Sequence, residues 1–170
     1  LRYLQKYALI PGNFVVVGIG ARKVKRQPTI QQLLEWTDHF HHKGYRSVLS
    51  YTLGNAADPG YPADDEIANQ LMAQRPEIVP LCGSIQEAAA VIHLAAFSVI
   101  PDSGLMHVAA ASKGGVIGLF ADVDHSPHPS QWGPRGDHCS VIIAPRAISE
   151  LPTKVFLETF SHFIESPRTK

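Results

Sequence analysis

The feature that most constrains the fold is an alternation of short apolar segments with longer segments of helical periodicity. The first apolar segment, residues 14–20, is a continuous valine-rich run, which is typical of a strand buried on both faces of a parallel sheet. Strands that alternate with helices of about 10 to 15 residues indicate βαβ units. The sequence therefore predicts an α/β fold, a Rossmann-like three-layer arrangement around one parallel sheet.

The same patterns place the remaining elements. Thr29 and Gln32 have the spacing of a capping box at the start of a helix that Gly44 ends, and Ser84 with Glu87 repeats that spacing. Further strands are expected at 47–53, 78–81, 97–100, 116–120 and 141–144, and further helices at 64–74, 84–96, 104–113 and 152–164.

Composition excludes several classes of protein. The 170 residues are 45% hydrophobic and 18% charged, which suits one folded domain spanning residues 1–170. Lys and Arg total 15, as do Asp and Glu, so no basic excess points to a nucleic-acid partner. No apolar stretch approaches the roughly 20 residues of a transmembrane helix, and no signal peptide is visible. Cys82 and Cys139 are expected to be reduced thiols in a cytoplasmic protein.

Ligands of such sheets bind at the carboxyl ends of the strands, where residues 101–106 follow a predicted strand. Asp102 is expected to cap the next helix, and Gly104 lets a ligand approach the backbone. The free N–H groups of residues 103–106 would then bind an anion. An ordinary helix cap without a ligand is the alternative at this point.

A second candidate is the loop at residues 20–28, which holds Gly20, Arg22, Lys23, Lys25 and Arg26. Its place at a strand end suggests that these cations contact a diphosphate, although a solvated basic turn is the alternative. The segment has the first two glycines of Gly-x-Gly-x-x-Gly but Lys23 in the third place, which disfavours a nicotinamide dinucleotide.

Two other chemistries fit poorly. Asp102, Ser103 and His107 suggest a serine hydrolase, but no glycine stands two residues before Ser103, as the motif Gly-x-Ser-x-Gly requires. A zinc site is the second alternative, and a histidine-rich surface loop is favoured over it because the spacing matches no common ligand set. The zinc candidates are His125, His128, His138 and Cys139.

Several segments resemble the glycosyltransferases of family 9, the lipopolysaccharide heptosyltransferases. Residues 100–120 read IPDSGLMHVAAASKGGVIGLF, and this segment resembles the family pattern Asp-Ser/Thr-Gly-x-x-His-x-Ala-Ala followed by a strand that ends in Phe. The later WGPRG contains the family's Trp-Gly-Pro, and GIGARKVKRQP resembles its lysine loop. The resemblance extends from about Phe14 to Ile164.

The resemblance implies a GT-B fold, built from two Rossmann-like halves with the active site between them. The matching segments belong to the C-terminal, donor-binding half, so the N-terminal acceptor half is expected to be absent from residues 1–170. The implied donor is a nucleotide-diphosphate sugar such as ADP-heptose. Its diphosphate would bind the N–H groups of residues 103–105, beside His107 and Lys25. The base would lie along Gly83 and Ser84, and an acidic residue within 58–66 would bind the ribose hydroxyls. The implied donor-binding residues are Gly20, Arg22, Lys25, Arg26, Gly83, Ser84, Asp102, Ser103, Gly104, Leu105 and His107.

Departures from the family pattern concern the donor. Gln27 replaces the family's tryptophan, and Ala121-Asp122 replaces a turn of small residues. The loop after residue 53 is longer than its counterpart, so four acids compete for the ribose. They are Asp58, Asp64, Asp65 and Glu66.

For the complete enzyme, the resemblance implies inverting transfer without a metal or another cofactor, in bacterial lipopolysaccharide or surface-polysaccharide synthesis. The acceptor would be a saccharide or lipid-linked saccharide, and the missing half would supply the general base and any peripheral contact with the inner membrane. Leu1 replaces an initiator methionine, so an excised or processed chain, inactive alone, is expected. The alternatives are a sugar-nucleotide epimerase of GT-B build and a non-catalytic nucleotide-sugar-binding module.

Overall fold

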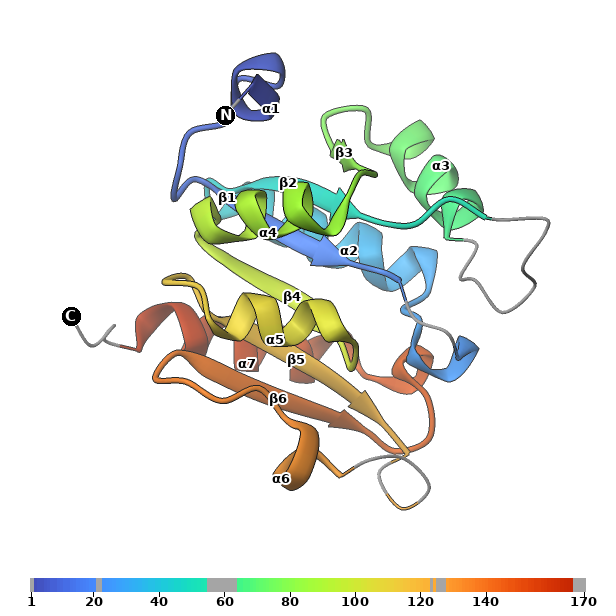
Figure 1. The fold of residues 1–170 in the computed structure, drawn as a ribbon. Coiled ribbons are helices and arrows are strands. Elements are labelled where there is room, and N and C mark those ends of the chain that lie inside the picture. Colours follow the sequence, from blue (N-terminus) through green and yellow to red (C-terminus); the bar gives the residue numbers. More distant parts are fainter. Residues whose placement is uncertain (1, 21–22, 55–63, 123, 125–127, 167–170) are drawn as a thin grey trace.

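The structure is a computed structural model that describes residues 2–20, 23–54, 64–122, 124 and 128–166. Its centre is a parallel sheet of six strands in the order β3-β2-β1-β4-β5-β6 (Figure 1). The strands are β1 (Phe14–Gly18), β2 (Arg46–Ser50), β3 (Val79–Leu81), β4 (Phe97–Pro101), β5 (Val116–Ala121) and β6 (Cys139–Ala144). The chain reverses its direction of winding between β1 and β4, and in such sheets this switch point is where ligands bind.

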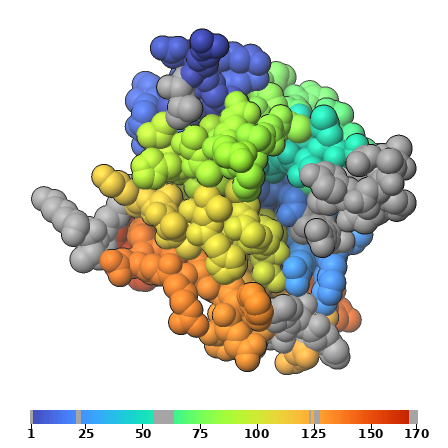
Figure 2. Space-filling view, in the orientation of Figure 1, coloured from blue at the N-terminus to red at the C-terminus, as the bar shows by residue number. Residues whose placement is uncertain are grey.

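Helices cover both faces of the sheet, which confirms the predicted three-layer fold. One face is packed by α2 (Ile30–His42), α3 (Asp65–Gln74) and α7 (Thr153–Glu165). The other is packed by α1 (Arg2–Lys6), α4 (Ile85–Leu94) and α5 (Gly104–Ala110), and Figure 2 shows α4 and α5 side by side over it. The remaining helices are the short α6 (Pro129–Trp132) and two 3₁₀ turns, η1 (Val24–Arg26) and η2 (Ile148–Glu150).

The central strand β1 shows why the valine-rich segment is apolar throughout. Its residues alternate between two separate clusters, because successive side chains of a strand point to opposite faces. Val15 and Val17 join the cluster of α2 and α7, whereas Val16 joins that of α4 and α5. All five residues of β1 are buried.

The start of α2 is built as the sequence predicts. Thr29 and Gln32 form the reciprocal capping box, and Gly44, with φ of +86°, follows the helix in the left-handed conformation that glycine favours. The buried Gln32 side chain also donates to the carbonyls of Ile148 (2.7 Å) and Leu151 (2.9 Å). One residue therefore caps α2 and ties it to η2 and to the residue that follows it.

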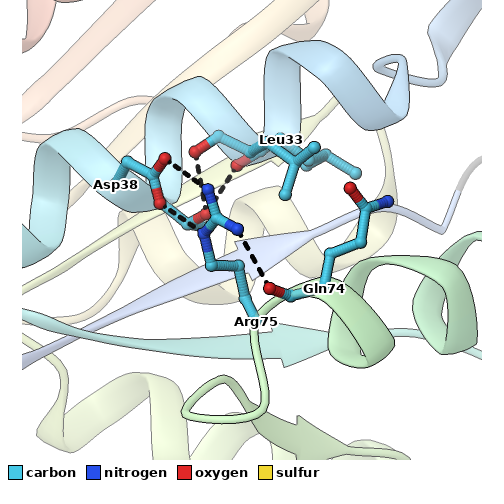
Figure 3. Close-up of polar contacts among 6 residues, drawn as sticks. Leu33, Asp38, Gln74 and Arg75 are labelled. Atoms are coloured by element: carbon cyan, nitrogen blue, oxygen red, sulfur yellow. Dashed lines mark hydrogen bonds and ion pairs between the residues drawn. The ribbon is translucent and has the colours of Figure 1, made fainter.

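An ion pair joins α2 to the end of α3, as Figure 3 shows. The guanidinium of Arg75 donates to both carboxylate oxygens of Asp38, at 2.6 and 2.7 Å. Hydrogen bonding to Arg75 lowers the pKa of Asp38 and raises that of Arg75. Both side chains remain partly exposed, so this pair orients α3 more than it stabilises the fold.

The predicted elements differ from the structure at several ends. The strand expected at 47–53 is Arg46–Ser50, and the helix expected at 104–113 ends at Ala110. Helices α1 and α6 were not predicted, because each is too short to show a helical period. Tyr3 of α1 donates its hydroxyl to the carbonyl of Pro80 (2.8 Å) on the edge strand β3, so α1 is held by a contact distant in sequence.

Candidate functional site

An open cleft of about 260 Å³ lies at the carboxyl ends of β1, β2, β3 and β4. Gly18 ends β1 at its floor, where a Cβ atom would come within 3.2 Å of the Ile100 side chain. The lining residues come from the loops that follow these strands and from the starts of α4 and α5. They are Gly18, Gly20, Ser50, Tyr51, Thr52, Leu81, Gly83, Ser84, Ile85, Ala88, Ile100, Ser103 and Leu105.

The start of α5 differs in part from the sequence prediction. Ser103, not Asp102, is the N-cap residue, and its side chain makes no capping hydrogen bond. The N–H of Met106 was predicted to be free, but it donates to the carbonyl of Ser103 (3.1 Å). The N–H groups of Gly104 and Leu105 belong to the first turn and have no carbonyl partner within α5. The candidate anion contacts are therefore fewer than predicted.

Asp102 has another role, because its side chain faces the basic loop. Its carboxylate accepts from Arg26 (2.9 Å), and its carbonyl accepts from the same guanidinium (3.2 Å). Lys25 forms an ion pair with the carboxylate of Asp122 after β5, at 2.6 Å between Nζ and Oδ2. Of the cations predicted to meet a diphosphate, Lys25 and Arg26 thus each contact a carboxylate at the end of another strand.

Gln27 continues this series toward β2. Its side-chain amide donates to Oδ1 of Asp64 (3.0 Å), the residue that precedes α3. Three consecutive side chains of one loop, residues 25–27, therefore contact three carboxylates in turn. These carboxylates follow β5, follow β4 and precede α3, respectively. This arrangement fixes the loop across the switch point of the sheet.

Asp64 is a buried carboxyl group beside the cleft. It is 0% exposed, and burial is the main cause that raises its pKa to about 6. Its Oδ2 has no hydrogen-bond partner among the described residues and lies 3.0 Å from where a Cβ of Gly20 would stand. Gly20 therefore leaves the space that this carboxyl group needs.

The four predicted ribose acids have different surroundings. Asp64 does not reach the cleft surface, because it is enclosed. Asp65 is half-buried and accepts from the N–H of Gly54 (3.1 Å), whereas Glu66 is exposed on α3. Asp58 lies outside the described residues.

The other predicted donor-binding residues divide into two groups. Gly20, Gly83, Ser84, Ser103 and Leu105 line the cleft. Gly104 and His107 are exposed on α5, and Arg22 lies outside the described residues. The partly exposed Lys25, Arg26 and Asp102 are not among the residues that line the cleft.

Sequence reasoning missed part of the cleft wall. Tyr51 and Thr52 follow β2, and the half-exposed Ile85 and the buried Ala88 lie on the first turns of α4. These residues share one edge of the sheet with the predicted ones, so the strand ends indicated the right loops. No pattern in the sequence indicated which side chains would turn inward.

The histidines of the zinc hypothesis have separate structural surroundings. The His128 ring accepts the N–H of Ser130 (3.1 Å) at the start of α6, and the His138 ring packs on Phe163 with centroids 4.0 Å apart. Within the described part of the chain, no three His, Cys, Asp or Glu residues are arranged to hold a metal ion. His125 lies outside it.

The strand order, with a cleft at its switch point, defines the Rossmann-like class of α/β fold. The sequence profile described as "Glycosyltransferase family 9 (heptosyltransferase)" matches residues 13–155, so the chain belongs to glycosyltransferase family 9. No curated protein sequence matches the chain. Among the helices of the described residues, none is long and apolar enough to cross a bilayer.

Solved structures share the fold. E. coli heptosyltransferase WaaC with ADP has a TM-score of 0.77 at 20% identity, and the match covers 95% of this chain and 47% of that one. A family 9 glycosyltransferase from Veillonella parvula DSM 2008 has a TM-score of 0.76 at 16% identity, and the match covers 96% of this chain and 49% of that one. E. coli ADP-heptose lps heptosyltransferase II has a TM-score of 0.74 at 20% identity, and the match covers 96% of this chain and 50% of that one. The chain therefore spans about half the length of these proteins.

Proposed function

We propose that residues 1–170 form the C-terminal, donor-binding half of a GT-B glycosyltransferase and bind a nucleotide-diphosphate sugar. Membership of family 9 supports a role in glycosyl transfer. The match to about half of each heptosyltransferase supports the assignment of residues 1–170 to one half of such an enzyme. The observation that carries the proposal is the open cleft at the switch point, where Ser103 and Leu105 bring the start of α5 to its wall. ADP in the WaaC structure makes an ADP-sugar the first donor class to test.

In this proposal the two ends of the donor meet different surfaces. The diphosphate lies at the first turn of α5, where unpaired N–H groups favour an anion. The base lies over the apolar wall of Leu81, Ile85 and Ala88, beside the backbone of Gly83 and Ser84. Asp65 is the described acid that we assign to the ribose hydroxyls, because Asp64 is enclosed and Glu66 is exposed.

The chemistry follows from what this half can supply. Lys25 and Arg26, together with the N–H groups of α5, would stabilise the charge that develops on the leaving diphosphate. We propose inverting transfer without a metal, onto a saccharide or lipid-linked saccharide acceptor of bacterial surface-polysaccharide synthesis in the cytoplasm. The general base would come from a separate N-terminal half, so this half alone would bind the donor without transferring the sugar. The epimerase and the stand-alone module are not favoured, because the family match is to glycosyltransferases.

Calorimetric titration with ADP, UDP and their sugars tests the donor site. We expect saturable binding with a preference for one base, because in this proposal the base would lie against the apolar wall and the backbone of Gly83 and Ser84, which line the cleft. Absence of binding to every nucleotide would refute the proposal.

The variant Lys25→Ala tests the assignment of the diphosphate. We expect it to weaken ADP binding by about 1 to 3 kcal/mol, the range for a charged hydrogen bond, and to leave adenosine binding unchanged. The matched control is Lys154→Ala, which removes a lysine from the exposed face of α7. Equal ADP affinity in the Lys25 variant and the parent would place Lys25 outside the site.

A further inference from the structure

Asp122 stands at the end of β5 in an unusual backbone conformation. Its φ is +53°, and it is one of two described non-glycine residues with positive φ. Aspartate tolerates this left-handed region better than most residues, but the conformation is still unfavourable compared with ordinary backbone. Its N–H donates to the carbonyl of Ala144 (3.3 Å), so the backbone is attached to the end of β6.

The side chain of Asp122 reaches the lysine that the proposed function assigns to the diphosphate. Oδ2 lies 2.6 Å from Nζ of Lys25, and the two side chains are 24% and 26% exposed. The pair is therefore partly shielded from water and joins groups 97 residues apart in the chain. A carboxylate at this distance occupies one of the three donor directions of the ammonium.

We propose that Asp122 competes with the donor diphosphate for Lys25 and so sets how tightly the nucleotide is held. This inference rests on the proposed function, since it takes Lys25 as a diphosphate ligand. A phosphate oxygen on the same ammonium would lie near the Asp122 carboxylate, and like charges at such short range repel strongly where water is partly excluded. Binding of the donor must therefore weaken or displace the Lys25–Asp122 pair.

The neighbouring pairs do not have the same consequence. Arg26 is held by both the carboxylate and the carbonyl of Asp102, and a guanidinium has five donors, so it can keep both contacts and still meet a phosphate. Gln27 is neutral and holds Asp64 below the cleft surface. Asp122 is thus the acid whose charge opposes the donor most directly.

The test is calorimetric titration of ADP into the parent chain and the variant Asp122→Asn. Asparagine keeps the shape and the tolerance for positive φ but removes the charge, so ADP is expected to bind about three- to tenfold more tightly. Asp122→Gly, which also relieves the backbone, is the second variant and should tighten binding at least as much. Unchanged or weaker ADP binding in both variants overturns the proposal.

Two further variants separate competition from a general charge effect. Asp38→Asn removes the same charge from the α2–α3 pair, remote from the cleft, and should leave ADP affinity within about twofold of the parent. In a Lys25→Ala background, Asp122→Asn should change affinity by less than about twofold, because the competition acts through Lys25. An equal gain in both backgrounds overturns competition. A parent chain that binds none of ADP, UDP and their sugars overturns the proposed function itself, whereas nucleotide binding that Lys25→Ala weakens and Asp122→Asn leaves unchanged overturns this inference alone.

Discussion

Asp64 shows how one buried carboxyl group links the cleft to the stability of the chain. Gln27 donates to Oδ1, while Oδ2 has no partner among the described residues and faces the backbone at Gly20. Burial favours the neutral acid, which is why its pKa is raised to about 6. Above that pH the fold must hold a buried negative charge.

The first prediction concerns Asp64→Asn and the pH dependence of unfolding. The folded state keeps the Asp64 proton up to about pH 6, whereas the unfolded chain releases it near the ordinary value of 3.8. The folded state therefore binds more protons between these pH values, and the Asp64 contribution makes the free energy of unfolding fall as pH rises, by at most about 3 kcal/mol. Asp64→Asn should remove this part of the decline.

Urea denaturation at pH 4.5 and 7.5 measures the effect as the difference between variant and parent. Glu66→Gln is the control, because Glu66 is exposed in the first turn of α3, just after Asp64, and should leave the pH dependence as it is. If Asp64→Asn and the parent lose equal stability between these pH values, Asp64 is ionised without cost in the fold.

At the scale of the element, α2 depends on Gln32 more than a capping motif alone implies. The sequence predicts the box with Thr29, and the structure confirms it. The second use of Gln32, its two bonds to the carbonyls of Ile148 and Leu151, depends on residues 116 and 119 positions away. Such a contact has no local pattern that could predict it.

The second prediction therefore ranks two variants of the same cap. Thr29→Ala removes one capping bond and should lower the free energy of unfolding by about 1 kcal/mol. Gln32→Ala also leaves two carbonyls without their donor in a buried place, so a loss of about 2 to 4 kcal/mol is expected. Urea denaturation of both variants measures the difference. Equal losses would mean that the link to η2 contributes nothing beyond the cap.

At the scale of the whole molecule, stability and binding lie in different parts of the sheet. A large aromatic cluster joins α2, α7 and β4 on one face of the sheet. There the ring centroid of Phe160 lies 5.1 Å from that of Phe40 and 5.5 Å from that of Phe97. The cleft lies at the carboxyl edge instead, between loops that follow β1, β2, β3 and β4. Changes in the cluster should therefore alter stability without altering the donor site.

The third prediction tests this separation with Phe160→Ala. Phe160 is 0% exposed, so truncation should lower the free energy of unfolding by about 3 to 5 kcal/mol. Arg75→Ala, which breaks the exposed pair in Figure 3, should lower it far less. ADP affinity, measured below the unfolding temperature of each variant, should match that of the parent. A change in affinity for Phe160→Ala would show that the cluster controls the cleft.

Much of the fold follows from the sequence because its main interactions are local or periodic. The valine run, the cap at Thr29 and the glycine at 44 each act within a few residues, and all three are found where predicted. The predicted strand ends also bring Gly20, Ser84 and Ser103 to one cleft, since carboxyl ends of parallel strands share an edge.

The tertiary structure alone decided which charges meet. The sequence indicated cations at one strand end and an acid at another, but it did not indicate that Lys25 pairs with Asp122, that Arg26 pairs with Asp102 in place of a helix cap, or that Asp64 is enclosed. The physical reason is that charge pairing and desolvation depend on distance in space and on exposure to water, which distant segments set together. Periodicity is a property of the chain itself, whereas these contacts exist only after β1, β4 and β5 have come together.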